Sequence, residues 1–124
     1  MDEFSLKKRI QSFKHAFTGL SYVIQTQHNA WIHLSVSVLV IVAGFGFNIS
    51  NTEWLVIILT IGMVISFEII NTAIEILLDR FHPEYDKQVG LIKDIGAAGV
   101  LMSAICAAII GLIIFLPKVI DLLF

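Results

Sequence analysis

The chain has 124 residues, which is room for one domain, and its net charge at pH 7 is only −2. Hydrophobic residues make up 57% of the sequence and charged residues only 15%, whereas a soluble domain usually has about 25% charged residues. This composition excludes an ordinary soluble globule, and no basic, aromatic-rich stripe points to a nucleic-acid partner. We therefore expect an all-α integral membrane protein in which residues 1–124 form a single domain.

Residues 4–26 predict an amphipathic helix. Apolar side chains recur there at alternating steps of four and three residues, which is the helical period: Leu6, Ile10, Phe13, Phe17, Leu20 and Ile24. Lys7, Lys8 and Lys14 fall on the other side, as in a helix that lies in the membrane interface with its lysines toward phosphates. The alternative is a soluble helix packed on its own domain, but the rest of the chain offers little soluble core.

Three apolar runs follow, each long enough to span a membrane as a helix. They are residues 32–49, 54–79 and 95–116. A short polar turn at 48–53 and a polar loop at 82–90 separate them, and we expect Pro117 to end the third run. Small residues in the third run would let helices approach closely: Gly96, Ala97, Gly99, Ser103, Ala107 and Gly111.

Basic residues predict the orientation of the spans. Lysine and arginine precede the first run and lie between the second and third: Lys7, Lys8, Arg9 and Lys14, then Arg80, Lys87 and Lys93. The turn between the first two runs has none. By the positive-inside rule, the N-terminus and the 80–94 loop should face the cytoplasm.

The second run carries polar residues on one helical face, which we call the polar stripe. At about 100° per residue, five positions fall within a narrow arc: Glu68, Asn71, Thr72, Glu75 and Asp79. Ionisable residues inside a membrane are expensive and face protein or water rather than lipid. The stripe therefore indicates a functional site, and its alternative is a polar contact that only holds helices together.

Depth assigns different tasks to the two glutamates. With a rise of about 1.5 Å per residue, Glu68 lies about 21 Å along the helix from Trp54 and Glu75 about 31 Å. The hydrocarbon core is about 30 Å thick, so Glu68 lies below the cytoplasmic surface and Glu75 close to it. A buried glutamate can act as a base, and a carboxylate at the rim can bind Mg²⁺ together with substrate phosphates.

Lys93 and Asp94 stand at the same cytoplasmic edge, at the start of the third run. Lys93 could meet a phosphate or could simply extend to the membrane surface. The sequence has neither a GxxxxGK[ST] loop nor HExxH, and its four histidines are not at metal-ligand spacing. Nucleotide chemistry would thus depend on carboxylates, Mg²⁺ and a few basic groups.

Several of these segments together resemble the prokaryotic diacylglycerol kinase family, which includes undecaprenol kinases. They are EIINTAIEILLDR (68–80), KDIGAAGVL (93–101), FKHAFTGL (13–20), HNAWIHL (28–34) and GLIIFLPK (111–118), in that family's order along nearly the whole chain. The resemblance implies a homotrimer of small subunits in the bacterial inner membrane. Each subunit would have three transmembrane helices and an amphipathic surface helix. Such enzymes transfer the γ-phosphoryl group of MgATP to a lipid hydroxyl at the cytoplasmic interface, in sites shared between subunits.

The resemblance also implies roles for individual residues. Glu68 would be the general base that takes the lipid hydroxyl proton, with Asn71 beside it, and Glu75 would bind the metal. Five further positions would contact ATP: Lys8, Glu84, Asp86, Lys93 and Asp94.

Gln27 departs from the family pattern, because many members have a glutamate there as a second metal ligand. A neutral amide is a poorer Mg²⁺ ligand than a carboxylate. Either Glu75 binds the metal with ATP oxygens alone, or Asp79 or Glu84 compensates, or the metal site is weak.

Two other functions stay open at this stage. One is a non-catalytic or altered family member that binds lipid or nucleotide, which the Gln27 substitution favours. The other is a small proton-linked membrane carrier, since proton relays also use membrane glutamates; a relay, however, needs polar residues that reach both sides. The sequence also leaves open whether a kinase of this kind would act on diacylglycerol or undecaprenol.

Overall fold

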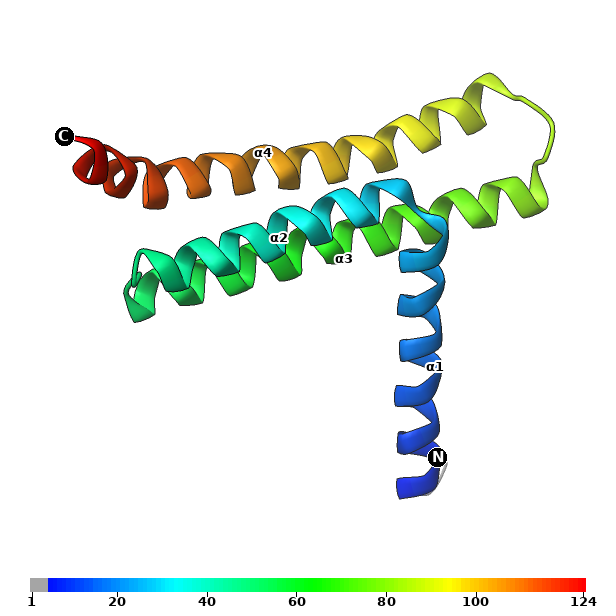
Figure 1. Ribbon diagram of the computed structural model, residues 1–124. Helices are drawn as coiled ribbons and strands as arrows, with labels where there is room; N and C mark the ends of the chain where they lie inside the picture. The colour runs from blue at the N-terminus through cyan, green and yellow to red at the C-terminus, as the bar shows by residue number, and fades with distance from the viewer. Residues whose placement is uncertain (1–4) are drawn as a thin grey trace.

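The computed structural model describes residues 5–124, which form four helices joined by short turns. They are α1 (Leu6–Thr26), α2 (His28–Gly46), α3 (Asn51–Phe81) and α4 (Lys87–Leu123). Helices α2, α3 and α4 lie alongside one another, whereas α1 leaves this bundle crosswise (Figure 1). Helix α3 packs against each of the other three. The all-α fold with three helices long and apolar enough to cross a membrane confirms the predicted fold class.

The two longest helices extend beyond the hydrocarbon region of a bilayer. Helix α3 has 31 residues and α4 has 37, so at a rise of about 1.5 Å per residue they measure about 46 and 56 Å. The hydrocarbon core is about 30 Å thick. The C-terminal end of α3 and the N-terminal end of α4, which are joined by a short loop (Figure 1), can therefore stand in the headgroup region or in water.

Local capping sets the helix ends, so they differ from the bounds of the predicted apolar runs. Helix α1 begins at Leu6, after Ser5, whose hydroxyl accepts from the Lys8 amide at 3.5 Å; residue 4 of the predicted range lies outside the described residues. Helix α2 begins at His28 rather than at residue 32 and ends at Gly46 rather than at 49. It ends early because Asn48 has a positive φ of 49°, a conformation that single Asn residues adopt but helices do not continue.

Caps also lengthen the next two helices toward their N-termini. Helix α3 begins at Asn51 rather than 54 because Ser50 and Glu53 form a reciprocal capping box. Helix α4 begins at Lys87 rather than 95, because the Asp86 carboxylate accepts from the Gln88 amide at 2.7 Å. The predicted 82–90 loop is thus shortened to residues 82–86. Which part of each helix lies in lipid stays a prediction.

The prediction that Pro117 ends the third apolar helix is wrong, because α4 continues through it to Leu123. A proline inside a helix removes one backbone hydrogen bond and often bends the helix. The turn after it is tied to α3 by Lys118, whose Nζ lies 2.9 Å from Oε1 of Glu53. This ion pair joins the last part of α4 to the start of α3.

The apolar core lies at the end of the bundle where α2 turns into α3. Ile49, Ile57 and Ile114 are buried there in one cluster. The backbone of Gly44 approaches Trp54 so closely that an added Cβ would lie 2.6 Å from its ring. Tight packing thus holds the three long helices together at this end, away from the polar stripe.

Candidate active site

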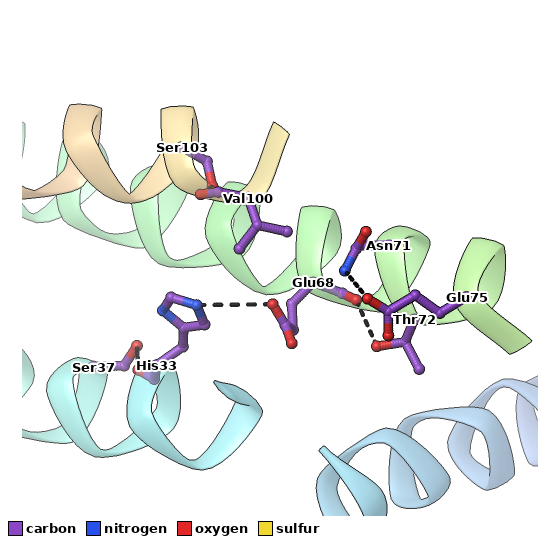
Figure 2. A network of polar contacts seen from close by, with 8 residues as sticks. All are labelled: His33, Ser37, Glu68, Asn71, Thr72, Glu75, Val100 and Ser103. Carbon is purple, nitrogen blue, oxygen red and sulfur yellow. Dashed lines mark hydrogen bonds and ion pairs between the residues drawn. The ribbon is translucent and has the colours of Figure 1, made fainter. Parts of the chain in front are cut away.

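The first part of the polar stripe is buried where α3 packs against the other helices. Glu68, Asn71 and Thr72 have relative exposures of 3%, 8% and 1%. Glu75 is half-buried and Asp79 is exposed, so burial decreases along the stripe toward the α3–α4 loop. Figure 2 shows Glu68, Asn71, Thr72 and Glu75 along α3, with Glu68 turned toward His33 of α2.

Glu68 faces His33 of α2. Its Oε2 atom lies 3.8 Å from Nε2 of His33 and has no hydrogen-bond partner among residues 5–124. The side chain of Glu68 is 4% exposed and that of His33 is 20% exposed. Thr72 contributes locally: its hydroxyl donates to the Glu68 backbone carbonyl at 2.9 Å. The carboxylate at this position is therefore enclosed, with one oxygen left for a further contact.

Asn71 connects the two glutamates of the stripe. Its Nδ2 donates to Oε1 of Glu75 at 3.2 Å, and a carboxylate acceptor fixes which end of the amide is nitrogen. The other end, Oδ1, is buried without a hydrogen-bond partner in the described part of the chain. It faces Gly96 of α4, where an added Cβ would contact it. A glycine at this position of α4 therefore gives Asn71 its space.

A cavity of about 320 Å³ adjoins the stripe, and we call it the site cavity. Its polar lining comes from α2 and α3, and small or apolar residues of α4 close the other side. The lining side chains are Asn29, Ile32, His33, Glu68, Asn71, Glu75, Ala97, Val100, Leu101 and Ala104. Both unpartnered oxygens thus belong to residues that line one space.

Lys93 and Asp94 do not line the site cavity with the two glutamates. Lys93 pairs with Asp79, with 2.5 Å between Nζ and Oδ1. Asp94 lines a separate cavity of about 350 Å³ near the loop, together with Tyr85 and Lys87. The structure therefore brings Lys93 to the exposed end of the polar stripe and separates Asp94 from it.

The predicted residues of the 82–86 loop are exposed. Asp86 caps α4 through its carboxylate, which gives it a structural role besides any contact with a nucleotide. Glu84 stands beside Tyr85, whose exposure is 91%. An ATP role for Glu84 and Asp86 stays a prediction.

Helix α1 carries the two remaining predicted residues, Lys8 and Gln27. Gln27 lies at the junction with α2, where its Nε2 donates to the Thr26 hydroxyl at 3.3 Å and its backbone amide to Val23. Neither glutamate of the stripe is among these contacts. Near this junction, Leu20, Val23 and Ile24 of α1 line a small hollow beside Glu68. Lys8 lies near the other end of α1, about 18 Å before Leu20 at a rise of about 1.5 Å per residue. Within one chain, α1 therefore places Lys8 far from the part of α1 that reaches the stripe.

The described residues fit a metal that is held partly by its substrate. Among residues 5–124, no group of three or more His, Cys, Asp and Glu side chains could hold a metal alone. Mg²⁺, however, is usually bound by one or two carboxylates plus substrate phosphates. The Glu75 carboxylate, with the free Oδ1 of Asn71 nearby on the same face, is an oxygen donor set of that kind.

His33 was missed as a site residue by reasoning from the sequence. Its spacing from the other histidines carries no metal-binding pattern, and it belongs to a different helix from Glu68. The only sequence feature that included it was the HNAWIHL segment. Its position facing Glu68 depends on how α2 packs against α3, which local patterns do not report.

Comparison with known proteins gives consistent matches over most of the chain. Residues 14–115 match the family described as "Prokaryotic diacylglycerol kinase". The chain is 36% identical over 113 residues to a Bacillus subtilis (strain 168) protein named "Undecaprenol kinase", a match that covers 91% of this chain and 92% of that protein. It is 34% identical over 113 residues to a Synechocystis sp. protein named "Diacylglycerol kinase", covering 90% of this chain and 65% of that protein. A shorter match, 42% identical over 50 residues, is to the Escherichia coli (strain K12) protein named "Diacylglycerol kinase" and covers 40% of this chain and 41% of that protein.

Proposed function

Since this chain belongs to the prokaryotic diacylglycerol kinase family, we propose that it transfers the γ-phosphoryl group of MgATP to the hydroxyl of a membrane lipid. The observation that carries this proposal is the enclosed Glu68 carboxylate, which lines a cavity toward one end of the membrane helices. A lipid hydroxyl can approach this carboxylate without leaving the bilayer.

Glu68 is the general base in this proposal. It accepts the proton of the lipid hydroxyl while the hydroxyl oxygen attacks the γ-phosphorus, and the bond from that phosphorus to the β–γ bridging oxygen breaks to release ADP. Phosphoryl transfer depends mainly on positioning and charge stabilisation, so a base held in a fixed, buried position suits it. Asn71 supports the arrangement by holding the Glu75 carboxylate through its Nδ2.

Glu75 is the proposed protein ligand of Mg²⁺. The metal would supply neutralisation of the charge on the transferring phosphoryl group. Gln27, the other predicted ligand position, offers an amide oxygen, and its side chain nitrogen already donates to Thr26. We therefore propose that Glu75 and ATP oxygens supply most of the metal coordination.

Five residues are the proposed ATP contacts: Lys8, Glu84, Asp86, Lys93 and Asp94. The ion pair of Lys93 with Asp79 keeps one cation at the exposed end of the stripe, where a nucleotide would arrive from the cytoplasm. The predicted orientation, with this end facing the cytoplasm, follows from the basic residues of the N-terminus and the 80–94 loop.

A homotrimer with shared sites is part of the same proposal. Leu6, Ile10, Phe13 and Phe17 of α1 are each 68% to 70% exposed in one chain, so this apolar face is left for lipid or a neighbouring subunit. Lys8 lies toward the far end of α1 from its own stripe. Both features favour an arrangement in which α1 of one subunit completes the site of another.

The test is transfer of radiolabelled γ-phosphate from ATP to diacylglycerol and to undecaprenol, measured side by side in mixed micelles with Mg²⁺. We expect at least one of the two lipids to be phosphorylated, and the preferred one identifies the substrate class. Absence of transfer to either lipid, from protein shown to be folded by circular dichroism, would contradict the proposal. Thermal stabilisation by MgATP in that case would point to a family member that binds nucleotide without transferring phosphate.

A further inference from the structure

Glu68 is surrounded by apolar side chains on the side that faces α1 and α2. A small hollow there, of about 20 Å³, is lined by residues of α1, α2 and α3. Apart from Glu68 itself, His33 is the one polar side chain among the described residues that line it. The Glu68 carboxylate therefore meets a single hydrogen-bonding group on this side.

The side chain of His33 also lines three cavities of the bundle. It lines the small hollow, the site cavity, and a larger apolar cavity of about 340 Å³ between α2, α3 and α4. Its side chain is 20% exposed and is therefore largely fixed by its neighbours. Because it is on α2 and Glu68 is on α3, any contact between them joins the two helices at the depth of the carboxylate.

The geometry is close to that of a hydrogen bond. Nε2 of His33 and Oε2 of Glu68 are 3.8 Å apart, whereas N–H···O bonds measure about 2.7 to 3.2 Å. Catalytic hydrogen bonds are often long before substrate binds and tighten afterwards. Oε2 has no other partner among residues 5–124, so a movement of less than about 1.5 Å would satisfy a buried oxygen that is otherwise unpaired.

We infer that His33 is a positioning residue for the general base. Its Nε2–H donates to Oε2 of Glu68, which turns the other carboxylate oxygen toward the lipid hydroxyl in the site cavity. This inference rests on the proposed kinase function, because it concerns the orientation of the proposed base. His33 itself touches neither substrate in this account and exchanges no proton with them.

The experiment compares His33→Leu, His33→Gln and His33→Asn in the lipid-phosphorylation assay. The amide nitrogen of Gln reaches the region of Nε2, whereas that of Asn reaches only the region of Nδ1. We expect kcat to fall about 10- to 100-fold in His33→Leu, the range that a small misplacement of a catalytic group produces, with KM for ATP changed less than about twofold. His33→Gln should recover most of the activity and His33→Asn should not.

Ser35→Ala is the matched control, because Ser35 is an exposed serine of α2 close to His33 that lines none of the three spaces. It should keep the wild-type kcat. Equal activity of His33→Gln and His33→Asn would overturn the inference, and so would a wild-type kcat in His33→Leu. If His33→Leu does not fold, the comparison of the Gln and Asn variants still shows whether a donor at the position of Nε2 is required.

A second readout does not depend on turnover. In protein labelled with ¹⁵N-histidine, the Nε2 signal of His33, assigned as the signal missing from His33→Leu or His33→Gln, should move when Glu68 is changed to Gln. An unmoved Nε2 signal would overturn the contact itself. A wild-type protein that phosphorylates neither lipid but shows this shift would overturn the kinase function while leaving the contact established.

Discussion

Two buried oxygen atoms of the polar stripe, Oε2 of Glu68 and Oδ1 of Asn71, have no hydrogen-bond partner within residues 5–124. A buried polar atom without a partner costs about 1 to 3 kcal/mol, so atoms of this kind point to a ligand or to catalysis. The hydroxyl of Thr72, by contrast, is satisfied by its own helix. Glu68 and Asn71 therefore each have an oxygen available for a further contact, whereas the hydroxyl of Thr72 is already hydrogen-bonded.

Thr72→Val should test this difference. The substitution keeps the volume and removes a hydroxyl whose hydrogen bond contributes about 0.5 to 1.5 kcal/mol. We therefore expect a small loss of stability, while the rate of lipid phosphorylation stays within about twofold of wild type.

Asn71→Leu should reduce phosphorylation at least about 10-fold, because it breaks the hydrogen bond to Glu75 and removes the free Oδ1. Equal losses of activity in both variants, measured in the same micelles, would indicate that the stripe only joins helices.

Gln27→Glu should strengthen the metal site. A carboxylate is a better Mg²⁺ ligand than an amide, so the Mg²⁺ concentration for half-maximal activity should decrease, by about 3- to 10-fold for a gain of about 1 kcal/mol. A Mg²⁺ titration of the phosphorylation rate measures this. An unchanged titration midpoint would mean that residue 27 does not contact the metal in this protein.

At the scale of helices, two glycines fix two different contacts. Gly96 of α4 leaves space for Oδ1 of Asn71, and Gly44 of α2 leaves space for the ring of Trp54. The first contact lies at the polar stripe and the second at the apolar core. The run of small residues in 95–116 predicted close helix approach from the sequence, but not which side chain fills the space.

Gly96→Ala should therefore reduce lipid phosphorylation more than it reduces stability. Its Cβ would collide with Oδ1 of the Asn71 amide. The amide can turn away, which breaks its hydrogen bond to Glu75, and overpacking of this kind reduces stability by about 1 to 3 kcal/mol.

Gly44→Ala should lower the unfolding temperature with less effect on the activity of the protein that remains folded. Gly62→Ala is the control, since nothing lies within 4 Å of an added Cβ there, and alanine favours a helix by about 0.5 to 1 kcal/mol. Activity loss in Gly44→Ala equal to that in Gly96→Ala would contradict this assignment.

The helices themselves were predictable from the sequence, but their ends were not. Apolar runs report which residues can enter lipid, and they identified three long helices correctly. The ends depend on individual caps, such as the Ser50–Glu53 capping box and Asp86. Pro117 does not end α4 as expected, because a proline inside a long helix can bend the helix without breaking it.

At the scale of the molecule, the apolar core and the proposed active site lie at opposite ends of the bundle. The α2–α3 turn and the α3–α4 loop lie at opposite ends of the bundle (Figure 1). The end near the α2–α3 turn has the apolar core and the Glu53–Lys118 ion pair, while the polar stripe, residues 68 to 79, runs toward the α3–α4 loop. Helical spacing predicted that Glu68, Asn71 and Glu75 share a face. It did not predict His33 or the site cavity, because these depend on contacts between helices that are distant in the sequence.

Subunit mixing should test whether sites are shared. If Lys8 of one subunit acts with Glu68 of another, Lys8→Ala and Glu68→Gln proteins that are each poorly active should regain activity when their subunits are mixed. Random assortment in a trimer leaves about a quarter of such sites intact. Recovery is measured as phosphorylation by the mixed protein relative to wild type. No recovery, with exchange of subunits demonstrated by two affinity tags, would place both residues in the site of one subunit.

The role of Glu68 is the central claim, and the most direct measurement is phosphoryl transfer by Glu68→Gln alongside its binding of MgATP. Removing a general base typically reduces the rate about 10²- to 10⁴-fold, so we expect transfer to fall in that range. MgATP affinity should be unchanged, because the proposed nucleotide contacts are other residues. Glu53→Gln, which alters a glutamate at the opposite end of the same helix, should retain transfer. Full turnover by folded Glu68→Gln protein would contradict the account.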